Sequence, residues 1–295
     1  MSDTLHLGQV KVKTVLTKSN LPIAGYSVNP YIGCTHACRY CYACFMKRFT
    51  GHEEPWGTFL DVKYWEKIKN PEKYNNSTVI VGSVTDAYNP QEEQFRRTRA
   101  FLEEMQGSKI NLIITTKSDL VLRDLDLIKT FPSPLVSWSV NTLDEAFKED
   151  MDKAVPLERR CPAMKKCHEE GIRTTCFISP IFPEITEVFE IIERIGDFCD
   201  YIWLENLNLR GGFKAEIMQY IAEKYPHLLP LYQQIYNKND MTYWKILDQK
   251  VAEYAESKGL LYVVDQEPFL RDPTGKPVII NYFYHAQIRQ SAKKR

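Results

Sequence analysis

Three cysteines indicate what chemistry this sequence can perform. Cys34, Cys38 and Cys41 follow one another with the spacing C-x3-C-x2-C in one short segment. Thiolates bind iron-sulfur clusters, and three of them leave one iron of a 4Fe-4S cluster without a protein ligand. That open iron can take a bidentate small molecule. The spacing therefore predicts a cluster that takes part in catalysis rather than one that only carries electrons.

A fourth cysteine leaves another interpretation open. Cys44 lies three residues after Cys41, so four thiolates could form a closed site for zinc or for an electron-transfer cluster. Structural zinc sites usually take ligand pairs from separate segments, which disfavours zinc here. If the segment is helical, Cys44 shares a face with Cys41, and we expect it to be a packed small residue.

The cysteine spacing, followed by the aromatic residue Tyr42, resembles the signature of the radical S-adenosylmethionine (radical SAM) superfamily. In that superfamily the open iron binds the amino and carboxylate groups of S-adenosylmethionine. One electron then splits this molecule into methionine and a 5'-deoxyadenosyl radical, which abstracts hydrogen from a substrate. The resemblance therefore implies two cofactors, a 4Fe-4S cluster and S-adenosylmethionine, with Tyr40 and Tyr42 as candidate cofactor contacts.

Longer sequence motifs indicate which branch of the superfamily this chain resembles. Two sequence motifs are similar to motifs of radical SAM mobile pair protein B. They are Ser-Val-Asn-Pro-Tyr-Ile-Gly-Cys, which ends at Cys34, and Met-Lys-Arg-Phe-Thr, which ends at Thr50. The runs that begin at Val84 and at Ile114 resemble the spore photoproduct lyase-like branch. The mobile pair resemblance implies a companion radical SAM protein as a partner.

Composition limits the function classes. The chain has 295 residues, and 44% of them are hydrophobic. A chain of this length is typical of an α/β barrel that forms one domain. Lys plus Arg and Asp plus Glu both number 38, for a formal net charge of +0. No global basic field therefore draws the protein to nucleic acid, although a local basic groove would still allow such binding.

The N-terminal residues lack the basic and apolar regions of a signal peptide, and no apolar run is long enough to span a bilayer. We therefore expect a cytoplasmic protein with no membrane partner. In that compartment cysteines stay reduced, and we expect those outside the motif to be packed thiols.

From residue 78 onward, short β-branched runs alternate with amphipathic stretches, which is typical of repeated β-α units and a parallel sheet. The predicted strands cover residues 24–29, 78–84, 109–115, 134–140, 173–179 and 201–205. The predicted helices between them cover residues 91–105, 119–130, 157–170 and 187–195. This makes six units, in agreement with the partial, TIM-type (β/α)6 barrel that the radical SAM resemblance implies.

Two segments lie outside this repeat. Residues 46–77 form a long connection that could cover the cluster. Beyond residue 210 we predict helices over 213–224 and 242–258 and strands over 260–264 and 276–284. We expect one radical SAM domain over residues 1–295, with a core at about 22–210 and a helical and β extension at about 211–295.

Active sites of parallel barrels collect at the carboxyl ends of the strands. After the second strand the superfamily commonly has a Gly-Gly-Glu-like edge that holds the cofactor's amino group, and only Gly82 of it remains here. Asp86 could accept hydrogen bonds from an ammonium group or a ribose, or it could form a turn or helix cap. Lys117 could meet a carboxylate or a phosphate, or be solvated.

Further candidates follow the later strands. Ser137 and Ser139 alternate along the fourth strand and face one side of the sheet. Arg160 matches an Arg-x-x-Ala pattern whose arginine, by resemblance, clamps the cofactor carboxylate. Ser179 is a candidate cofactor contact at the exit of the fifth strand. Glu205, at the end of the sixth, is a candidate for recognising substrate or adenosine.

Three functions are consistent with these features. The first is a radical SAM enzyme acting on an unidentified substrate, with a small electron-donor protein of the flavodoxin or ferredoxin type as partner. The second is repair of a pyrimidine lesion in DNA, which the zero net charge disfavours. The third is a non-enzymatic iron-sulfur electron carrier or a zinc-stabilised module.

Overall fold

The computed structural model describes residues 5–209, 211–264 and 272–283. It divides into two compact units. The first consists of Met1–Trp138 and Glu149–Thr174, and the second of Ser139–Lys148 and Thr175–Arg295.

The larger sheet of the first unit is mostly parallel. β3 (Tyr26–Val28), β6 (Thr78–Val81), β7 (Asn111–Thr116) and β8 (Leu135–Val140) lie in this order, and β2 (Leu16–Lys18) pairs antiparallel with β3. β6 and β7 are short β-branched runs with buried residues on both faces, as expected of parallel strands covered by helices. The strands predicted at 24–29, 78–84, 109–115 and 134–140 are confirmed.

A smaller sheet in this unit was not predicted. β1 (His6–Val12) pairs parallel with β5 (Phe59–Trp65), and β4 (Tyr31–Ile32) pairs antiparallel with β5. Leu60 and Val62 of β5 pack with Tyr31 in a small core. Their alternation with polar residues is the signal that could have revealed the strand. The connection at residues 46–77 therefore contains regular structure.

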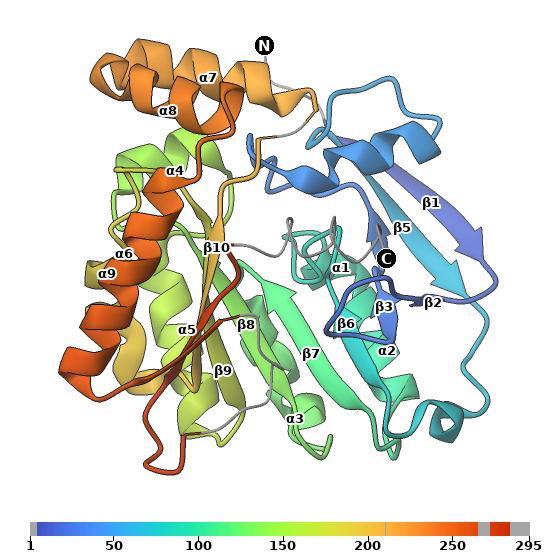
Figure 1. The fold of residues 1–295 in the computed structure, drawn as a ribbon. Coiled ribbons are helices and arrows are strands. Elements are labelled where there is room, and N and C mark those ends of the chain that lie inside the picture. The colour runs from blue at the N-terminus through green and yellow to red at the C-terminus, as the bar shows by residue number, and fades with distance from the viewer. Residues whose placement is uncertain (1–4, 210, 265–271, 284–295) are drawn as a thin grey trace, which may run out of the picture. The chain divides into compact units, whose positions relative to one another are not determined.

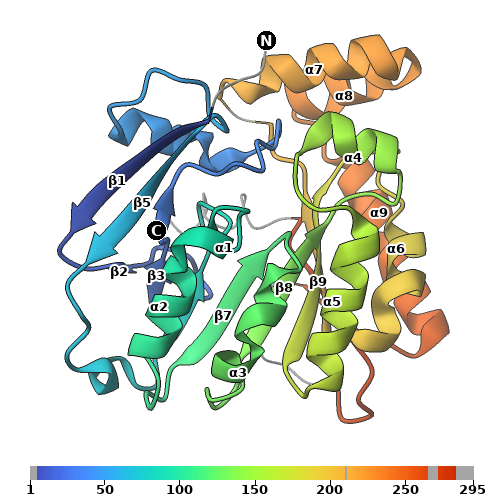
Figure 2. The same ribbon diagram turned by 180° about the vertical axis from the view of Figure 1, so that it is seen from behind.

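The helices of the first unit are shorter than the sequence predicts. The helix predicted at 91–105 is divided into α1 (Glu92–Phe95) and α2 (Arg97–Glu104), because Arg96 has φ +49°. The helix predicted at 119–130 begins as a 3-10 turn, η3 (Leu120–Asp124), and continues as α3 (Leu125–Ile128). α5 (Leu157–Glu169) agrees with the prediction. Figure 2 shows α2 and α3 on one face of β6 and β7.

The second unit has its own parallel strands. β9 (Arg173–Ile181), β10 (Tyr201–Asn206), β12 (Val278–Asn281) and β11 (Leu261–Val264) are neighbours in this order. Strands were predicted at all four places. The strand predicted at 276–284, which corresponds to β12, extends to residue 284, which lies outside the described residues.

Helices of the second unit were predicted in part. α6 (Val188–Ile195), α7 (Phe213–Lys224) and α9 (Thr242–Lys258) agree with the predictions, whereas α4 (Glu145–Met151) and α8 (Leu229–Asn237) were not predicted. Figure 1 shows α7 and α8 side by side beyond the carboxyl end of β10. The remaining 3-10 turns are η1 (Tyr42–Phe49), η2 (Pro71–Tyr74), η4 (Gly196–Phe198) and η5 (Pro226–Leu228).

The predicted α/β class with a mostly parallel sheet is confirmed. Within the described part of the chain, no helix combines the length and apolar character needed to cross a bilayer.

Candidate functional site

The cysteine loop begins at Gly33, directly after β4, and is fixed by close backbone packing. Gly33 has φ +88°, and a Cβ there would lie 2.3 Å from the carbonyl oxygen of Phe59 on β5. Gly57 has φ +100°, and a Cβ there would lie 2.5 Å from the Cβ of Ala37 in the middle of the loop. Only glycine tolerates both the conformation and the approach. The loop is thus packed against β5 and against the segment that contains Gly57.

The three thiols of the motif lie close together. Cys34 is buried, and Cys38 and Cys41 are half-buried. Burial raises the pKa of each thiol to about 12. The negative charge of one thiolate also raises the pKa of a neighbouring thiol. Cys41 acts in this way on Cys34, Cys34 acts on Cys38, and Cys38 acts on Cys41. Three such groups ionise together only when a positively charged group binds them.

Cys44 differs from these three thiols. It lies in η1, and its N–H donates to the carbonyl oxygen of Cys41 over 3.3 Å. Burial raises the pKa of Cys44, and none of the other three thiols contributes to that shift. The residues therefore fit a group held by three thiolates.

Throughout residues 5–209, 211–264 and 272–283, no three His, Cys, Asp or Glu side chains are placed to share one metal ion. A 4Fe-4S cluster does not need such convergence, because each thiolate binds a different iron. The arrangement of the three thiols is therefore compatible with a 4Fe-4S cluster.

Trp56 lies beside the cysteine loop. Its buried indole N–H has no hydrogen-bond partner among the described residues, yet it is near enough to lower the pKa of Cys41. The Trp56 ring packs edge-on against Phe59, with 5.7 Å between the ring centroids. A donor close to a ligand sulfur is the type of contact that tunes a cluster. Trp56 is thus a specific contact between the connection at residues 46–77 and the cysteine loop, as expected if this connection covers the loop.

Charged groups surround Cys38. Burial by itself raises the pKa of Asp152, but Lys117, Arg160 and the Tyr40 hydroxyl outweigh it and hold that pKa below its usual value. Tyr40 Oη donates to Asp152 Oδ2 over 2.9 Å, and Arg160 Nη2 lies 3.5 Å from Asp152 Oδ1. Against the effect of burial, Lys117 is the group that most lowers the pKa of Cys38. The two cations favour the thiolate form of Cys38, whereas the Asp152 carboxylate opposes it.

Arg160 itself is almost fully buried, with 2% of its surface exposed. Its Nε donates to the carbonyl oxygen of Val155 over 2.7 Å. The guanidinium is therefore held in place by this carbonyl and by Asp152. The Arg160 guanidinium, which was predicted to bind the cofactor carboxylate, lies among the charged groups beside Cys38. Its contact with a cofactor stays a prediction.

Asp86 joins the cysteine loop to the ends of two strands. Its carboxylate accepts hydrogen bonds from the Thr116 hydroxyl and the Lys117 N–H, each over 2.7 Å, and from the Tyr88 N–H over 2.8 Å. His36 Nε2 lies 3.0 Å away. Burial alone raises the pKa of Asp86, but His36, the Lys117 N–H and the Thr116 hydroxyl lower it to about 2. These contacts hold the Asp86 carboxylate in place beside the cysteine loop, and its contact with a cofactor stays a prediction.

Gly82 and Tyr42 fix the segment that follows β6. Gly82 has φ +93°, and a Cβ there would lie 2.6 Å from the Thr115 carbonyl oxygen. Tyr42 is 58% exposed, and its hydroxyl donates to the carbonyl oxygen of Ser83. Thr85 Oγ1 donates to the Gly33 carbonyl oxygen over 2.6 Å. The segment after β6 is thereby tied to the cysteine loop.

The three candidate serines are divided between the units. Ser137 on β8 is buried in the first unit. Ser139 and Ser179 belong to the second unit, where Ser179 Oγ donates to Glu205 Oε2 over 2.8 Å. Their contacts with a cofactor stay predictions.

Trp56 and Asp152 were not predicted from the sequence. Trp56 lies in the connection at residues 46–77, but nothing local placed it on the cysteine loop. Asp152 comes far later in the sequence than Cys38 and acts on its pKa only because the chain folds back. No local pattern could have identified it.

Curated relatives are similar over most of the chain. The uncharacterized protein MJ0683 of Methanocaldococcus jannaschii is 36% identical over 241 residues, which cover 81% of this chain and 90% of that protein. Protein ORF301 of Acidianus two-tailed virus is 30% identical over 221 residues, covering 68% of this chain and 73% of that protein. Neither carries the mobile pair name, so that narrower resemblance stays a prediction.

Two solved structures show the same fold. Spore photoproduct lyase with bound AdoMet and dinucleoside spore photoproduct matches with a TM-score of 0.54 and 17% identity, over 75% of this chain and 66% of that chain. Streptococcus suis SuiB bound to S-adenosylmethionine matches with a TM-score of 0.53 and 14% identity, over 86% of this chain and 49% of that chain. This chain thus spans just under two thirds of the first and about half of the second.

A model of the radical SAM superfamily matches residues 28–195. This range is more than half of the chain, and it contains the cysteine loop and the elements from β4 to α6. It agrees with the expectation from the cysteine spacing, and the two solved structures confirm the expected fold. The chain therefore belongs to the radical SAM superfamily.

Proposed function

We propose that this chain holds a 4Fe-4S cluster through Cys34, Cys38 and Cys41 and reductively cleaves S-adenosylmethionine to act on a substrate that is still unidentified. The observation that carries the proposal is the set of three neighbouring thiols, each with a pKa raised by burial, in a chain of the radical SAM superfamily. Enzymes of this superfamily use a 4Fe-4S cluster and S-adenosylmethionine. Bound here, the cluster would supply the single electron for cleavage.

The chain's own residues would support this chemistry in three ways. The thiolates bind the cluster, and Lys117 favours the ionised form of Cys38 and Cys41. Trp56 brings an N–H close to Cys41. Gly33 and Gly57 let neighbouring segments pack closely on the loop and so hold it in position.

Cofactor contacts are proposed on the same basis. Tyr40 and Tyr42 lie within and directly after the motif, and Gly82 leaves backbone groups without an intervening side chain. Lys117 and Arg160 are cations suited to a carboxylate. The remaining proposed contacts are Asp86, Ser137, Ser139 and Ser179.

The substrate does not follow from the structural likenesses. Identities of 17% and 14% show the fold alone, so neither the photoproduct bound by the lyase nor the precursor peptide bound by SuiB is carried over. Repair of a DNA lesion remains the alternative hypothesis. We also propose a cytoplasmic location, where thiols stay reduced, and two partners, a small electron donor and a companion radical SAM protein.

The test uses protein reconstituted anaerobically with iron and sulfide. We expect dithionite-reduced protein to give a 4Fe-4S electron paramagnetic resonance signal that changes on addition of S-adenosylmethionine, together with 5'-deoxyadenosine among the products. Cys38→Ala should lose both the signal and the product. Cys44→Ser removes a thiol from the same segment and is the matched control, which should keep both.

Other results would support a different function or a different set of cysteine ligands. An iron signal that is indifferent to S-adenosylmethionine would favour an electron carrier. A signal that survives in Cys38→Ala but disappears in Cys44→Ser would show that the ligand set has been assigned to the wrong cysteines.

A further inference from the structure

Directly after Cys41, η1 presents an aromatic surface to solvent. Phe45 is 42% exposed and Phe49 is 66% exposed, and both lie on this short helix with the exposed ring of Tyr42. Ala43 is the residue of η1 that is buried. Large apolar side chains at this exposure are unusual on one short helix, and such patches mark interaction sites.

The patch also carries a fixed cation. The Arg48 guanidinium lies over the Phe49 ring, 4.6 Å from its centroid, and 5.4 Å from the centroid of Phe45. Lys47 Nζ donates to the carbonyl oxygen of Glu53 over 2.8 Å, so its charge stays in the same region. Aromatic residues and arginine are the types enriched in protein interfaces and in their hot spots. We call Phe45, Arg48 and Phe49 the η1 patch.

The charge of this part of the chain has one sign. η1 itself contains Lys47 and Arg48 and no Asp or Glu, although the whole chain has a formal net charge of +0. Of the two carboxylates that follow, Glu53 and Glu54, the second is already paired with His52 and His6. An acidic partner is therefore the one that this surface complements.

The position of the η1 patch suggests the purpose of such a partner. η1 starts at the residue after Cys41, and the Tyr42 hydroxyl anchors its start to the Ser83 carbonyl oxygen. A protein seated on this helix lies within a few residues of the thiols that hold the proposed cluster. Complexes for electron transfer are weak and small, and a patch of this size suits them.

We propose that the η1 patch is the docking surface for an acidic electron-donor protein with a one-electron cofactor. This inference rests on the function proposed above. The donor loses one electron and is oxidised, and that electron goes to the group held by the three cysteines. No covalent bond forms between the two proteins.

A single-stranded nucleic acid would also seek cations and aromatic rings. Its bases need free ring faces for stacking. The Arg48 guanidinium already lies over one face of the Phe49 ring and one face of the Phe45 ring, so fewer ring faces remain for bases. The surface therefore favours a protein, and nucleic acid becomes an outcome that the experiment can detect.

The experiment uses the full-length, reconstituted protein and a recombinant flavodoxin, an acidic flavin protein, as the probe. Binding is measured by biolayer interferometry at low and high salt, and reduction of the site is followed by absorbance with either reduced flavodoxin or dithionite. The variants are Arg48→Glu, Phe45→Ser and Phe49→Ser. Leu7→Ser is the matched control, because Leu7 is similarly exposed, at 52%, but lies on β1.

We expect each η1 patch variant to weaken flavodoxin binding about tenfold or more and to slow reduction by flavodoxin to a similar extent. Reduction by dithionite should stay unchanged, because this small reductant needs no docking surface. Salt should weaken binding of the unaltered protein more than that of Arg48→Glu. The Leu7→Ser variant should behave like the unaltered protein.

Unchanged flavodoxin binding in variants that dithionite still reduces at the normal rate would overturn the proposal. So would binding of a labelled oligothymidylate that is lost in these variants while flavodoxin does not bind at all. Failure of the proposed function is distinguishable, because it appears as absence of 5'-deoxyadenosine with dithionite, independently of any binding result.

Discussion

Gly82 shows how one residue determines the geometry beside the cysteines. Its φ of +93° disfavours any L side chain, and a Cβ would meet the Thr115 carbonyl oxygen at 2.6 Å. Gly107 has a similar φ of +83°, but a Cβ there would have no neighbouring atom within 4 Å among the described residues. Comparing substitutions at Gly82 and Gly107 therefore separates the free-energy cost of the backbone conformation from the cost of a steric clash.

We therefore predict that Gly107→Ala lowers the free energy of unfolding by about 1–2 kcal/mol, the cost of a left-handed residue. Gly82→Ala should lower it by about 1–3 kcal/mol more, because the added methyl group also forces its surroundings to move. Urea unfolding followed by circular dichroism measures both values. Equal losses in the two variants would contradict the clash.

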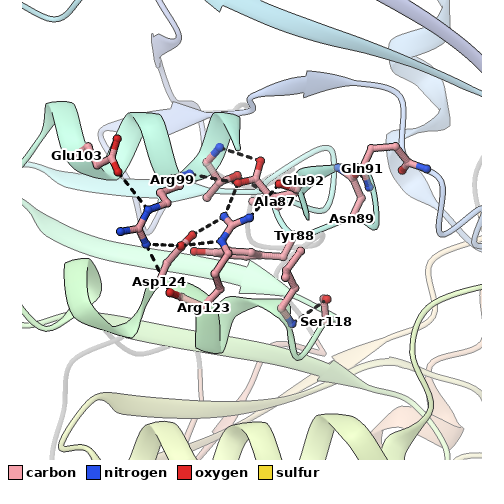
Figure 3. A network of polar contacts seen from close by, with 12 residues as sticks. Ala87, Tyr88, Asn89, Gln91, Glu92, Arg99, Glu103, Ser118, Arg123 and Asp124 are labelled. Carbon is pink, nitrogen blue, oxygen red and sulfur yellow. Dashed lines mark hydrogen bonds and ion pairs between the residues drawn. The ribbon is translucent and has the colours of Figure 1, made fainter. Parts of the chain in front are cut away.

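At the scale of elements, a buried polar network joins α1, α2 and η3 (Figure 3). Glu92 is fully buried, and its carboxylate accepts hydrogen bonds from the Thr98 N–H over 3.0 Å and from Arg123 over 2.6 Å. The Tyr31 hydroxyl of β4 donates to the same carboxylate. The strand that precedes the cysteine loop is thus tied to the helices after β6.

We expect Glu92→Gln to lower the free energy of unfolding by about 3 kcal/mol, because it leaves Arg123 with an incomplete set of buried partners. Glu103→Gln is the matched control. Glu103 pairs with Arg99 in the same network, but its side chain is 53% exposed, so the loss should stay below about 1 kcal/mol. Chemical denaturation of the two variants tests the difference, and a larger loss for Glu103→Gln would refute it.

The segment that carries Trp56 is held by a histidine. His52 Nδ1 lies 3.0 Å from Glu54 Oε2, and His52 Nε2 lies 3.0 Å from Asp61 Oδ2. Its ring stacks on Phe59 with 3.9 Å between the centroids. Partial burial alone lowers the pKa of His52, but the two carboxylates outweigh it and raise the pKa above its usual value.

A raised pKa makes this contact depend on pH in one direction. Its contribution to stability is complete below about pH 6.5, the usual value for histidine, and is lost as the pH rises through the higher pKa of the folded protein. We predict that His52→Gln lowers the Tm by about 1–2 °C at pH 6 and by less at pH 8.5. A Tm difference that grows with pH would contradict this sign. His227→Gln, at an exposed histidine, is the control.

At the scale of the whole molecule, the chain crosses between the two units within regular elements. The divisions fall between Trp138 and Ser139 in β8, between Lys148 and Glu149 in α4, and between Thr174 and Thr175 in β9. Neither unit is therefore built from one continuous segment with a linker at its end. Separate folding would require that three elements be interrupted.

We therefore propose that the chain unfolds as the single domain expected from its sequence. Calorimetry should show one thermal transition, with a calorimetric enthalpy equal to the van't Hoff enthalpy. The fragment 175–295, expressed alone, should lack a cooperative transition. Two resolved transitions, or a fragment that melts cooperatively, would show independent domains instead.

The sequence by itself determined the family and most of the parallel strands, and it predicts that three thiolates bind a cluster. These depend on local information, namely the spacing of Cys34, Cys38 and Cys41 and the short β-branched runs such as residues 78–81. Helix boundaries were predicted less well, because Arg96 adopts a positive φ that its residue type does not indicate. The strand β5 was missed because aromatic and polar turn residues surround its alternating core positions.

Only the tertiary structure decided what surrounds the thiols. Trp56 reaches Cys41 because Gly57 packs on Ala37, and Asp152 comes close to Cys38 because the chain returns there after β8. Periodicity and propensity act over one or two turns of chain, whereas these contacts depend on how distant segments pack. The electrostatic surroundings that set the pKa of each thiol are therefore a property of the fold and not of the motif.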